Sequence, residues 1–150
     1  MHIGHINLAK SFNGAGEHFV SLVEALREQG MQQHVLVRNI ALAKRLDLVD
    51  KVTAGPAVRS AIMAYCLMPH VDVVHIHDPS DGQAGLLLTL TRSIPFVLTH
   101  RDDAPGRNPL TQAVYKRASG IIYQSDADAA KHLRIYRHAV ATWREAVLSP

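Results

Sequence analysis

The chain alternates six times between a short apolar segment and a segment with helical periodicity. Parallel strands need crossover connections, so this alternation is typical of a parallel sheet with right-handed crossovers. We therefore predict an α/β protein of three layers, a doubly wound Rossmann-like fold with a mostly parallel sheet of six strands. The expected strands are 3–8, 34–37, 51–53, 73–76, 94–99 and 120–123. The expected helices are 17–29, 41–46, 58–68, 81–92, 110–118 and one from 126 to at least 134.

Length and composition agree with one such domain. The 150 residues are 47% hydrophobic and 19% charged, an ordinary globular balance. We expect one domain over residues 1–134, with 135–150 as an amphipathic helix packed on it. Cys66 is expected to be a core thiol without a disulfide, which fits a reducing compartment. The helical spacing also places Ile62, Tyr65, Leu86, Leu87 and Leu90 on buried faces.

The charge of the chain limits its partners. A formal net charge of +3 favours an anionic ligand or an anionic membrane surface. The positive charge is too weak and dispersed to indicate nucleic-acid binding, and only three Phe, four Tyr and one Trp are available for stacking. With no recognisable signal peptide or membrane-spanning apolar run, we expect a cytoplasmic protein, with peripheral contact to the inner face of a membrane as a further option.

Glycines follow the first expected strand, in the run Gly-Ala-Gly-Glu at 14–17. Glycines let a backbone approach a ligand closely, and the free amides of a helix N-terminus suit an anion. As a dinucleotide fingerprint the run is poor, because Phe19 occupies the position of the third glycine. Arg38, rather than an acidic residue, ends the second strand and would at most suit a 2′-phosphate. The run is thus either an ordinary loop-to-helix turn or an anion site.

The fourth expected strand ends in His77, Asp78 and Pro79. In open α/β sheets, ligands bind outside the carboxyl ends of strands where the strand order reverses. This strand would lie beside the first, so His77 and Asp78 would border that crevice. For both residues a site role and a helix-capping role stay open. His75 shares a face with His77, but a buried, hydrogen-bonded histidine is favoured over a metal ligand because no further ligand can be identified.

The fifth expected strand also ends in polar residues, Thr99 to Asp103. His100 would face the same crevice as His77. Asp102, with Arg101 and Arg107 nearby, more often belongs to a solvated charge cluster than to a site. The sequence shows no nucleophile elbow with a Ser-His-Asp order and no Walker motif.

Four segments in this order resemble the N-terminal half of a two-domain GT-B glycosyltransferase of the large retaining family 4. The resemblance covers residues 1 to about 133. Residues 14–17 resemble the family's Gly-Gly-x-Glu loop, with Ala15 in place of one glycine. Residues 72–79 resemble its Asp-Val-Val-His-x-His motif, and 96–100 its strand ending in Thr-x-His or Thr-His. Residues 118–125 resemble its Ala-Asp-x-Ile-Ile-x-x-Ser segment.

The resemblance implies a set of site residues and substrates. The family's N-terminal domain mainly binds the acceptor, a glycan or a lipid-linked molecule, and the donor is a nucleotide-sugar. His100 is implied near the transferred sugar, with His77 and Asp78 as further catalytic candidates. The implied donor-diphosphate loop is Gly14, Ala15, Gly16 and Glu17, and the acceptor-side candidates are Asn13, Arg101, Asp102 and Arg107. No cofactor and no metal are expected, because helix dipoles and basic side chains stabilise the leaving diphosphate.

The family's C-terminal domain, which holds most of the nucleotide-sugar site, is not encoded here. We therefore expect the isolated chain to be inactive, with a separate C-terminal glycosyltransferase half as its partner. The process expected from the resemblance is cell-envelope polysaccharide synthesis. Two alternatives stay open: a Rossmann module that binds a nucleotide or NADP, and a non-catalytic subunit that binds the acceptor.

Overall fold

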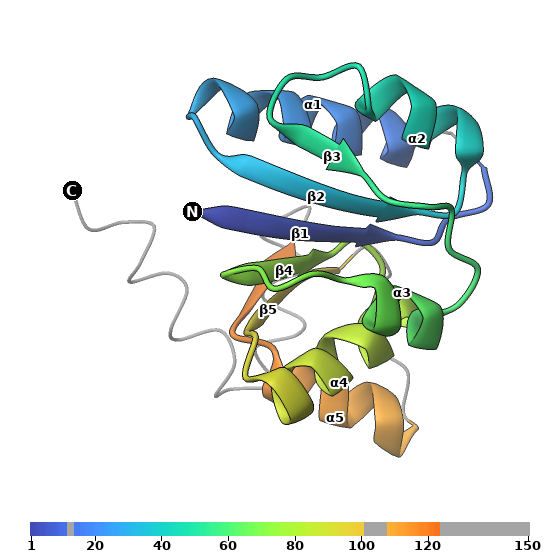
Figure 1. Ribbon diagram of the computed structural model, residues 1–150. Helices are drawn as coiled ribbons and strands as arrows, with labels where there is room; N and C mark the ends of the chain where they lie inside the picture. The colour runs from blue at the N-terminus through green and yellow to red at the C-terminus, as the bar shows by residue number, and fades with distance from the viewer. Residues whose placement is uncertain (12–13, 101–107, 124–150) are drawn as a thin grey trace.

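One sheet of six strands crosses the structure, a computed structural model that describes residues 1–11, 14–100 and 108–123 (Figure 1). The strands are β1 (His2–Asn7), β2 (Gln32–Val37), β3 (Val52–Ala54), β4 (Val73–Ile76), β5 (Phe96–His100) and β6 (Gly120–Tyr123). Their order is β3-β2-β1-β4-β5-β6, and every neighbouring pair is parallel. The predicted doubly wound parallel sheet is confirmed, and the strand order reverses between β1 and β4.

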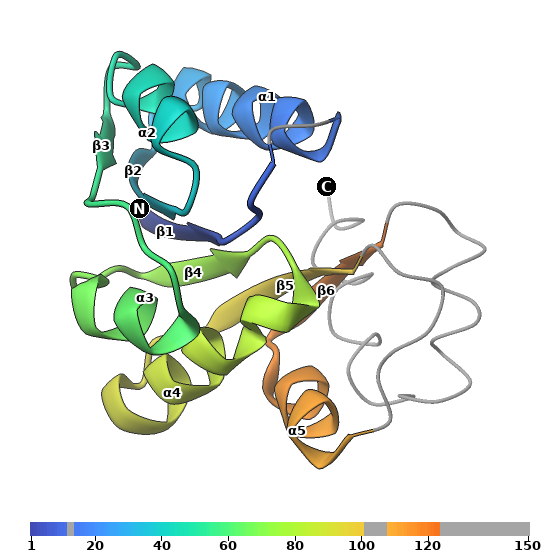
Figure 2. The ribbon, with the colours of Figure 1, turned by 90° about the vertical axis from the view of Figure 1, so that its right-hand side faces the viewer.

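Helices cover both faces of this sheet. They are α1 (Gly14–Glu28), α2 (Ile40–Leu46), α3 (Ala61–Leu67), α4 (Gly82–Arg92) and α5 (Pro109–Arg117), with a short 3-10 helix η1 (Pro79–Asp81) before α4. Helices α1 and α2 lie on one face, and α3, α4 and α5 lie on the other (Figures 1 and 2). The result is the predicted three-layer arrangement, because right-handed crossovers change face where the strand order reverses.

Each face of the sheet has its own hydrophobic core. Along β2, Val35 and Val37 belong to the core under α1 and α2, whereas Leu36 belongs to the core on the α3–α5 side. This alternation follows from the two-residue period of a strand. Strands β4 and β5 contribute mainly to the core on the α3–α5 side, through Val74, Ile76, Phe96 and Leu98.

Helix α4 presents two small residues, Ala84 and Gly85, to the sheet. Ala84, Gly85 and Leu88 are buried, and a Cβ added to Gly85 would lie 2.7 Å from Cγ of Phe96. The helix therefore packs closer to the sheet than a leucine-lined face would allow. Of the three leucines predicted to point inward, Leu86 is partly buried and packs against the core, Leu87 is only partly buried, and Leu90 is 55% exposed, so the prediction was wrong for Leu90.

Helix α3 differs from its prediction in a similar way. Ser60 caps it by accepting a hydrogen bond from the Met63 amide, so the helix begins at Ala61 and not at 58. Its buried residue is the small Ala64, while Ile62 is 63% exposed. The prediction of a core thiol was wrong, because Cys66 is exposed. The residues of α3 that pack against the core are Ala61, Ala64 and Tyr65.

Residues 124–150 lie outside the described part of the chain. The helix expected from 126, the C-terminal helix 135–150 and the boundary between them therefore stay predictions. Among the residues that the structure describes, no helix combines the length and the apolar character needed to cross a membrane.

Candidate functional site

The carboxyl ends of β1 and β4 meet at the point where the strand order reverses. The His77 amide donates to the Ile6 carbonyl over 3.0 Å, and the Leu8 amide donates to Oδ2 of Asp81 over 3.0 Å. The segment after β4 is thereby tied to the end of β1. Asp78 accepts from the Ser80 amide over 2.8 Å and so caps η1, which is the capping role that the sequence had left open.

Helix α1 begins at Gly14, three residues earlier than predicted. The run 14–17 therefore forms the first turn of the helix that follows β1, and its backbone amides belong to the N-terminus of α1. Gly16 is buried, and exposed Glu17 pairs with Arg45 of α2 over 3.6 Å. Four predicted acceptor-side residues, Asn13, Arg101, Asp102 and Arg107, lie outside the described residues.

Three histidines are buried side by side on the α1 face of the sheet. His5 of β1 is fully buried, and His75 and His77, in and just after β4, are 8% and 3% exposed. The rings of His75 and His77 are 4.0 Å apart between centroids, and His77 packs edge-on against Phe19 of α1 at 4.4 Å. His75 is also hydrogen-bonded to Oγ1 of Thr99 over 2.7 Å, which confirms it as a buried, satisfied histidine.

Hydrogen bonds join His77, His5, Gln33 and the Val23 carbonyl in a row. The Val23 carbonyl at the end of this row determines where the protons lie. The Val23 carbonyl can only accept, so Nε2 of Gln33 donates to it over 2.9 Å. Oε1 of Gln33 then faces Nε2 of His5 at 3.0 Å, so that His5 nitrogen must carry its proton. Nδ1 of His5 consequently accepts from Nε2 of His77 over 3.1 Å. The hydrogen bonds run in one direction, from β4 through β1 and β2 to α1, and leave Nδ1 of His77 as its acceptor nitrogen.

Burial keeps His5 neutral. The pKa of His5 is lowered to about 3, first by desolvation, then by the nearby His75, while the hydrogen bond to Gln33 acts in the opposite direction. At neutral pH His5 is therefore an uncharged imidazole, as the proton positions above require.

The same three imidazoles could hold a metal ion, since their ligand atoms lie within 4.8 Å of one another. The further ligand that the sequence did not identify beside His75 and His77 is His5 of β1. Sequence spacing could not reveal this ligand, since the register of β1 against β4 places His5 opposite His75. A metal bound to Nδ1 of His5 would displace the hydrogen bond between His5 and His77, so the row is described more simply as hydrogen-bonded imidazoles.

Replacing Gln33 with leucine should lower the free energy of unfolding by about 1–3 kcal/mol, because it leaves the buried His5 Nε2–H and the Val23 carbonyl without their partner. The neighbouring Gln32 is exposed, and Gln32→Leu should change stability by no more than about 0.5 kcal/mol. Urea denaturation of both variants measures the difference. Equal stability of the two would show that the row is not held by Gln33.

His100 does not join this row. It is buried on the α5 side, where its Nδ1 is hydrogen-bonded to the Tyr115 hydroxyl, with ring centroids 5.7 Å apart. Ile76 pairs with Leu98, so His77 lies opposite Thr99, one residue before His100. Successive side chains of a strand point to opposite faces of the sheet. The expectation that both histidines face one crevice is corrected here: their side chains lie on opposite faces of the sheet.

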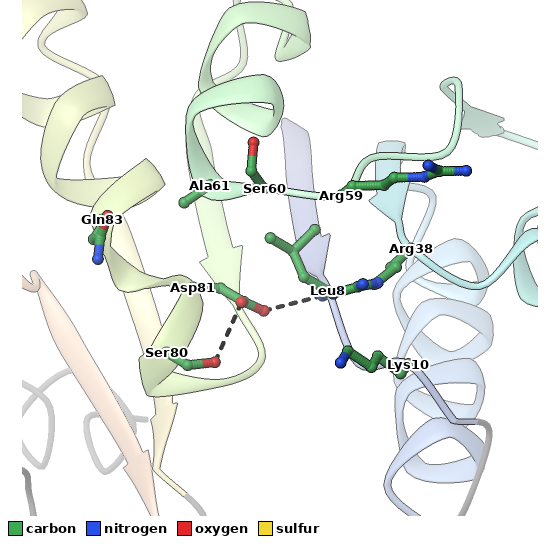
Figure 3. Close-up of a pocket in the computed structure, with 9 residues that line it drawn as sticks. All are labelled: Leu8, Lys10, Arg38, Arg59, Ser60, Ala61, Ser80, Asp81 and Gln83. Atoms are coloured by element: carbon green, nitrogen blue, oxygen red, sulfur yellow. Dashed lines mark hydrogen bonds between the residues drawn. The ribbon is translucent and has the colours of Figure 1, made fainter.

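A cavity of about 390 Å³ opens at the same edge, on the α3–α4 side (Figure 3). Its lining residues are Leu8, Lys10, Arg38, Arg59, Ser60, Ala61, Ser80, Asp81 and Gln83. Burial raises the pKa of Asp81 to about 6, although the Leu8 amide opposes this shift. Of this set, the sequence suggests a ligand role only for Arg38, and a helix-capping role for Ser80 or Asp81. Lys10, two residues after an expected strand end, could have been noticed for the same reason as Arg38.

The glycosyltransferase family 4 sequence model matches residues 12–144. Among solved structures, Anabaena Alr3699/HepE in complex with UDP-glucose is 14% identical, with a TM-score of 0.66 over 89% of this chain and 40% of that chain. The complex of the same protein with UDP gives 13% and 0.62 over the same shares. Apo UGT2 of Phytolacca americana is 13% identical, with a TM-score of 0.59 over 93% of this chain and 50% of that chain. No curated protein sequence matches.

These likenesses agree with the fold built above. The chain spans less than half of the Anabaena protein and half of the Phytolacca protein, so it corresponds to one part of such enzymes. The family model covers most of this chain, including β2 to β6 and the residues of the histidine row on β2 and β4. The chain belongs to glycosyltransferase family 4.

Proposed function

We propose that this chain forms the acceptor-side half of a retaining glycosyltransferase that transfers a sugar from a nucleotide-sugar to a glycan or lipid-linked acceptor. The observation that carries the proposal is the first turn of α1, which begins with Gly14 and Gly16 in the connection that follows β1. Such a turn suits a diphosphate, because the amides and the helix dipole both favour negative charge. The UDP and UDP-glucose bound by the Anabaena protein of the same fold support a uridine nucleotide-sugar as donor.

The chemistry proposed for this half is positioning and electrostatic stabilisation. The α1 amides would stabilise the diphosphate as the bond to the sugar breaks, which removes the need for a metal at that step. His100 stays the candidate beside the transferred sugar, and His77 with Asp78 the candidate at the end of β4. We place the reaction in the cytoplasm, at or near the inner face of the membrane, as a step of cell-envelope polysaccharide synthesis.

The test compares the chain alone with the chain combined with the C-terminal half of its own enzyme. Alone, it should release no UDP from UDP-glucose. Combined, with acceptor extract from its own cells, it should release UDP, and EDTA should leave the rate unchanged. Turnover by the isolated chain would refute its dependence on a second half, and loss of turnover in EDTA would refute metal independence.

Two further measurements, a thermal shift with NADP and a comparison of acceptor binding with donor turnover, separate this proposal from its alternatives. A rise in the melting temperature with NADP that Arg38→Ala abolishes would favour a dinucleotide-binding module, since Arg38 ends β2 where such modules read a 2′-phosphate. A complex with the C-terminal half that binds acceptor and never turns over donor would favour the non-catalytic subunit. Neither outcome is expected from the proposed transferase.

A further inference from the structure

The cavity on the α3–α4 side gathers basic residues from three separate parts of the chain. Lys10 follows β1, Arg38 follows β2, and Arg59 precedes α3. Residues so far apart in sequence meet here because the parallel strands end at one edge of the sheet. At about 390 Å³ the cavity is large enough for a sugar-sized ligand.

None of the three basic side chains of this cavity forms an ion pair with another described residue, although the charge of Arg38 acts on Asp81 and opposes the rise of its pKa. Among the described residues the ion pairs are Arg27 with Glu28 and Arg45 with Glu17, so none of the three cavity cations is in one. In Figure 3 the guanidinium of Arg38 is directed toward Leu8, and the ammonium of Lys10 toward the side of Asp81. Arg59 lies at the rim, with its guanidinium directed away from Asp81. Two cations thus converge on one space.

Asp81 gives this space a second kind of chemistry. Its side chain is 6% exposed and held by the Leu8 amide at 3.0 Å and the Ser80 hydroxyl at 3.3 Å, so its position is fixed. A carboxylate has more lone pairs than these two donors use and can accept from a hydroxyl. Cations beside a fixed carboxylate suit a ligand that carries an anionic group next to hydroxyl groups.

We propose that this cavity binds a phosphate on the sugar or polyol acceptor, with Lys10 and Arg38 contacting the phosphate and Asp81 a neighbouring hydroxyl. The proposal rests on the proposed glycosyltransferase function and narrows its acceptor to a phosphorylated one. The first turn of α1 remains the site of the donor diphosphate. Arg38 then contacts the acceptor, in place of the 2′-phosphate role that the sequence suggested for it.

The direct test is an NMR titration of the 150-residue chain with inorganic phosphate and with glucose 6-phosphate, with glucose as the uncharged control. Both phosphates should shift the Leu8 and Lys10 amides in a saturable way, and glucose 6-phosphate should bind more tightly than phosphate. Lys10→Gln and Arg38→Gln should each weaken binding at least about tenfold, since each removes a charge-assisted hydrogen bond. Lys44→Gln and Arg27→Gln, which remove equal charges elsewhere, should change it less than about twofold.

Asp81→Asn isolates the hydroxyl contact. It should leave the affinity for inorganic phosphate equal or higher, and should reduce the preference for glucose 6-phosphate over phosphate. Saturable shifts that persist unchanged in Arg38→Gln, or no saturable shift with either phosphate or with the vesicles below, would overturn the proposal.

A phosphate can belong to a soluble acceptor or to a lipid headgroup. Flotation with phosphatidylcholine vesicles, with and without phosphatidylglycerol, separates the two sources. Retention on the anionic vesicles that Arg38→Gln abolishes and Arg27→Gln does not would assign the phosphate to a lipid. Binding of glucose 6-phosphate without such retention would assign it to a soluble acceptor.

Failure of this proposal is distinguishable from failure of the proposed function. Phosphate binding by the chain requires no turnover, so it can be present when the two combined halves fail to use UDP-glucose. Conversely, a working transferase whose kcat/KM for its acceptor is equal with Arg38 and with Arg38→Gln would keep the function and exclude the phosphate subsite.

Discussion

Replacing Gly85 with valine should lower the free energy of unfolding by about 3 kcal/mol. The added Cβ would lie 2.7 and 2.8 Å from Cγ and Cδ2 of Phe96, and 3.2 Å from Cγ1 of Ile76. These neighbours cannot easily move, because Phe96 and Ile76 are fully buried in adjacent strands. The helix would have to move away from the sheet and open the core on that face.

The matched control is Leu90→Val, which places the same β-branched side chain at an exposed position of α4. It should cost only the difference in helix propensity, below about 1 kcal/mol. Guanidinium denaturation followed by circular dichroism measures both variants. A Gly85→Val protein as stable as the control would mean that α4 does not pack against β4 and β5 as described.

Removing the Asp81 carboxyl should make stability depend more steeply on pH, through two groups with opposite effects. His5 has a pKa of about 3 in the folded protein and 6.5 unfolded, so the unfolded chain takes up its proton first as pH falls. Above pH 6.5 His5 is neutral in both the folded and the unfolded state and does not make stability depend on pH. Between pH 6.5 and 3, the free energy of unfolding falls by about 1.4 kcal/mol for each unit that the pH decreases. His34, whose pKa is also lowered by burial, acts in the same direction.

Asp81 has the opposite sign. Its pKa is about 6 in the folded protein and 3.8 in the unfolded chain, so between these values the folded state binds the extra proton. Stability therefore rises as pH falls from 6 to 3.8, by up to about 3 kcal/mol. In the wild-type protein this gain offsets the loss from His5 over the same range, and we expect a shallow pH profile.

The experiment is urea denaturation of wild type and Asp81→Asn at pH 6, 5 and 4. Asparagine keeps an acceptor for the Leu8 amide but cannot titrate. The variant should lose about 1.4 kcal/mol more per pH unit than wild type over this range. Parallel profiles for Asp81→Asn and wild type would show that Asp81 is not protonated preferentially in the folded state.

The sheet was predictable because its signals are local. Short apolar runs such as 73–76 and 120–123 match β4 and β6 residue for residue, and the alternation with helices sets the parallel topology. The helix faces were less predictable. Hydrophobic periodicity favours the leucines of α4, but the distance between helix and sheet is set by Gly85, and no periodicity measures that distance.

The candidate site was predictable by position but not by orientation. Ends of strands β4 and β5 were correctly identified as the places where His77 and His100 lie. Whether two such residues face one another depends on the register of the strands, and one residue of offset moves a side chain to the other face. The same register brings His5 to His75, a contact across 70 residues of sequence that spacing alone does not indicate.

The one-way hydrogen bonds from His77 to the Val23 carbonyl have an electrostatic consequence. Each donor in the row points toward α1, so the bond dipoles add, and the β4 end of the row carries the negative pole. The row therefore adds negative potential on the α1 face at this edge, whereas the cations of Lys10 and Arg38 add positive potential on the opposite face. The sheet thus separates two contributions of opposite sign across a single edge.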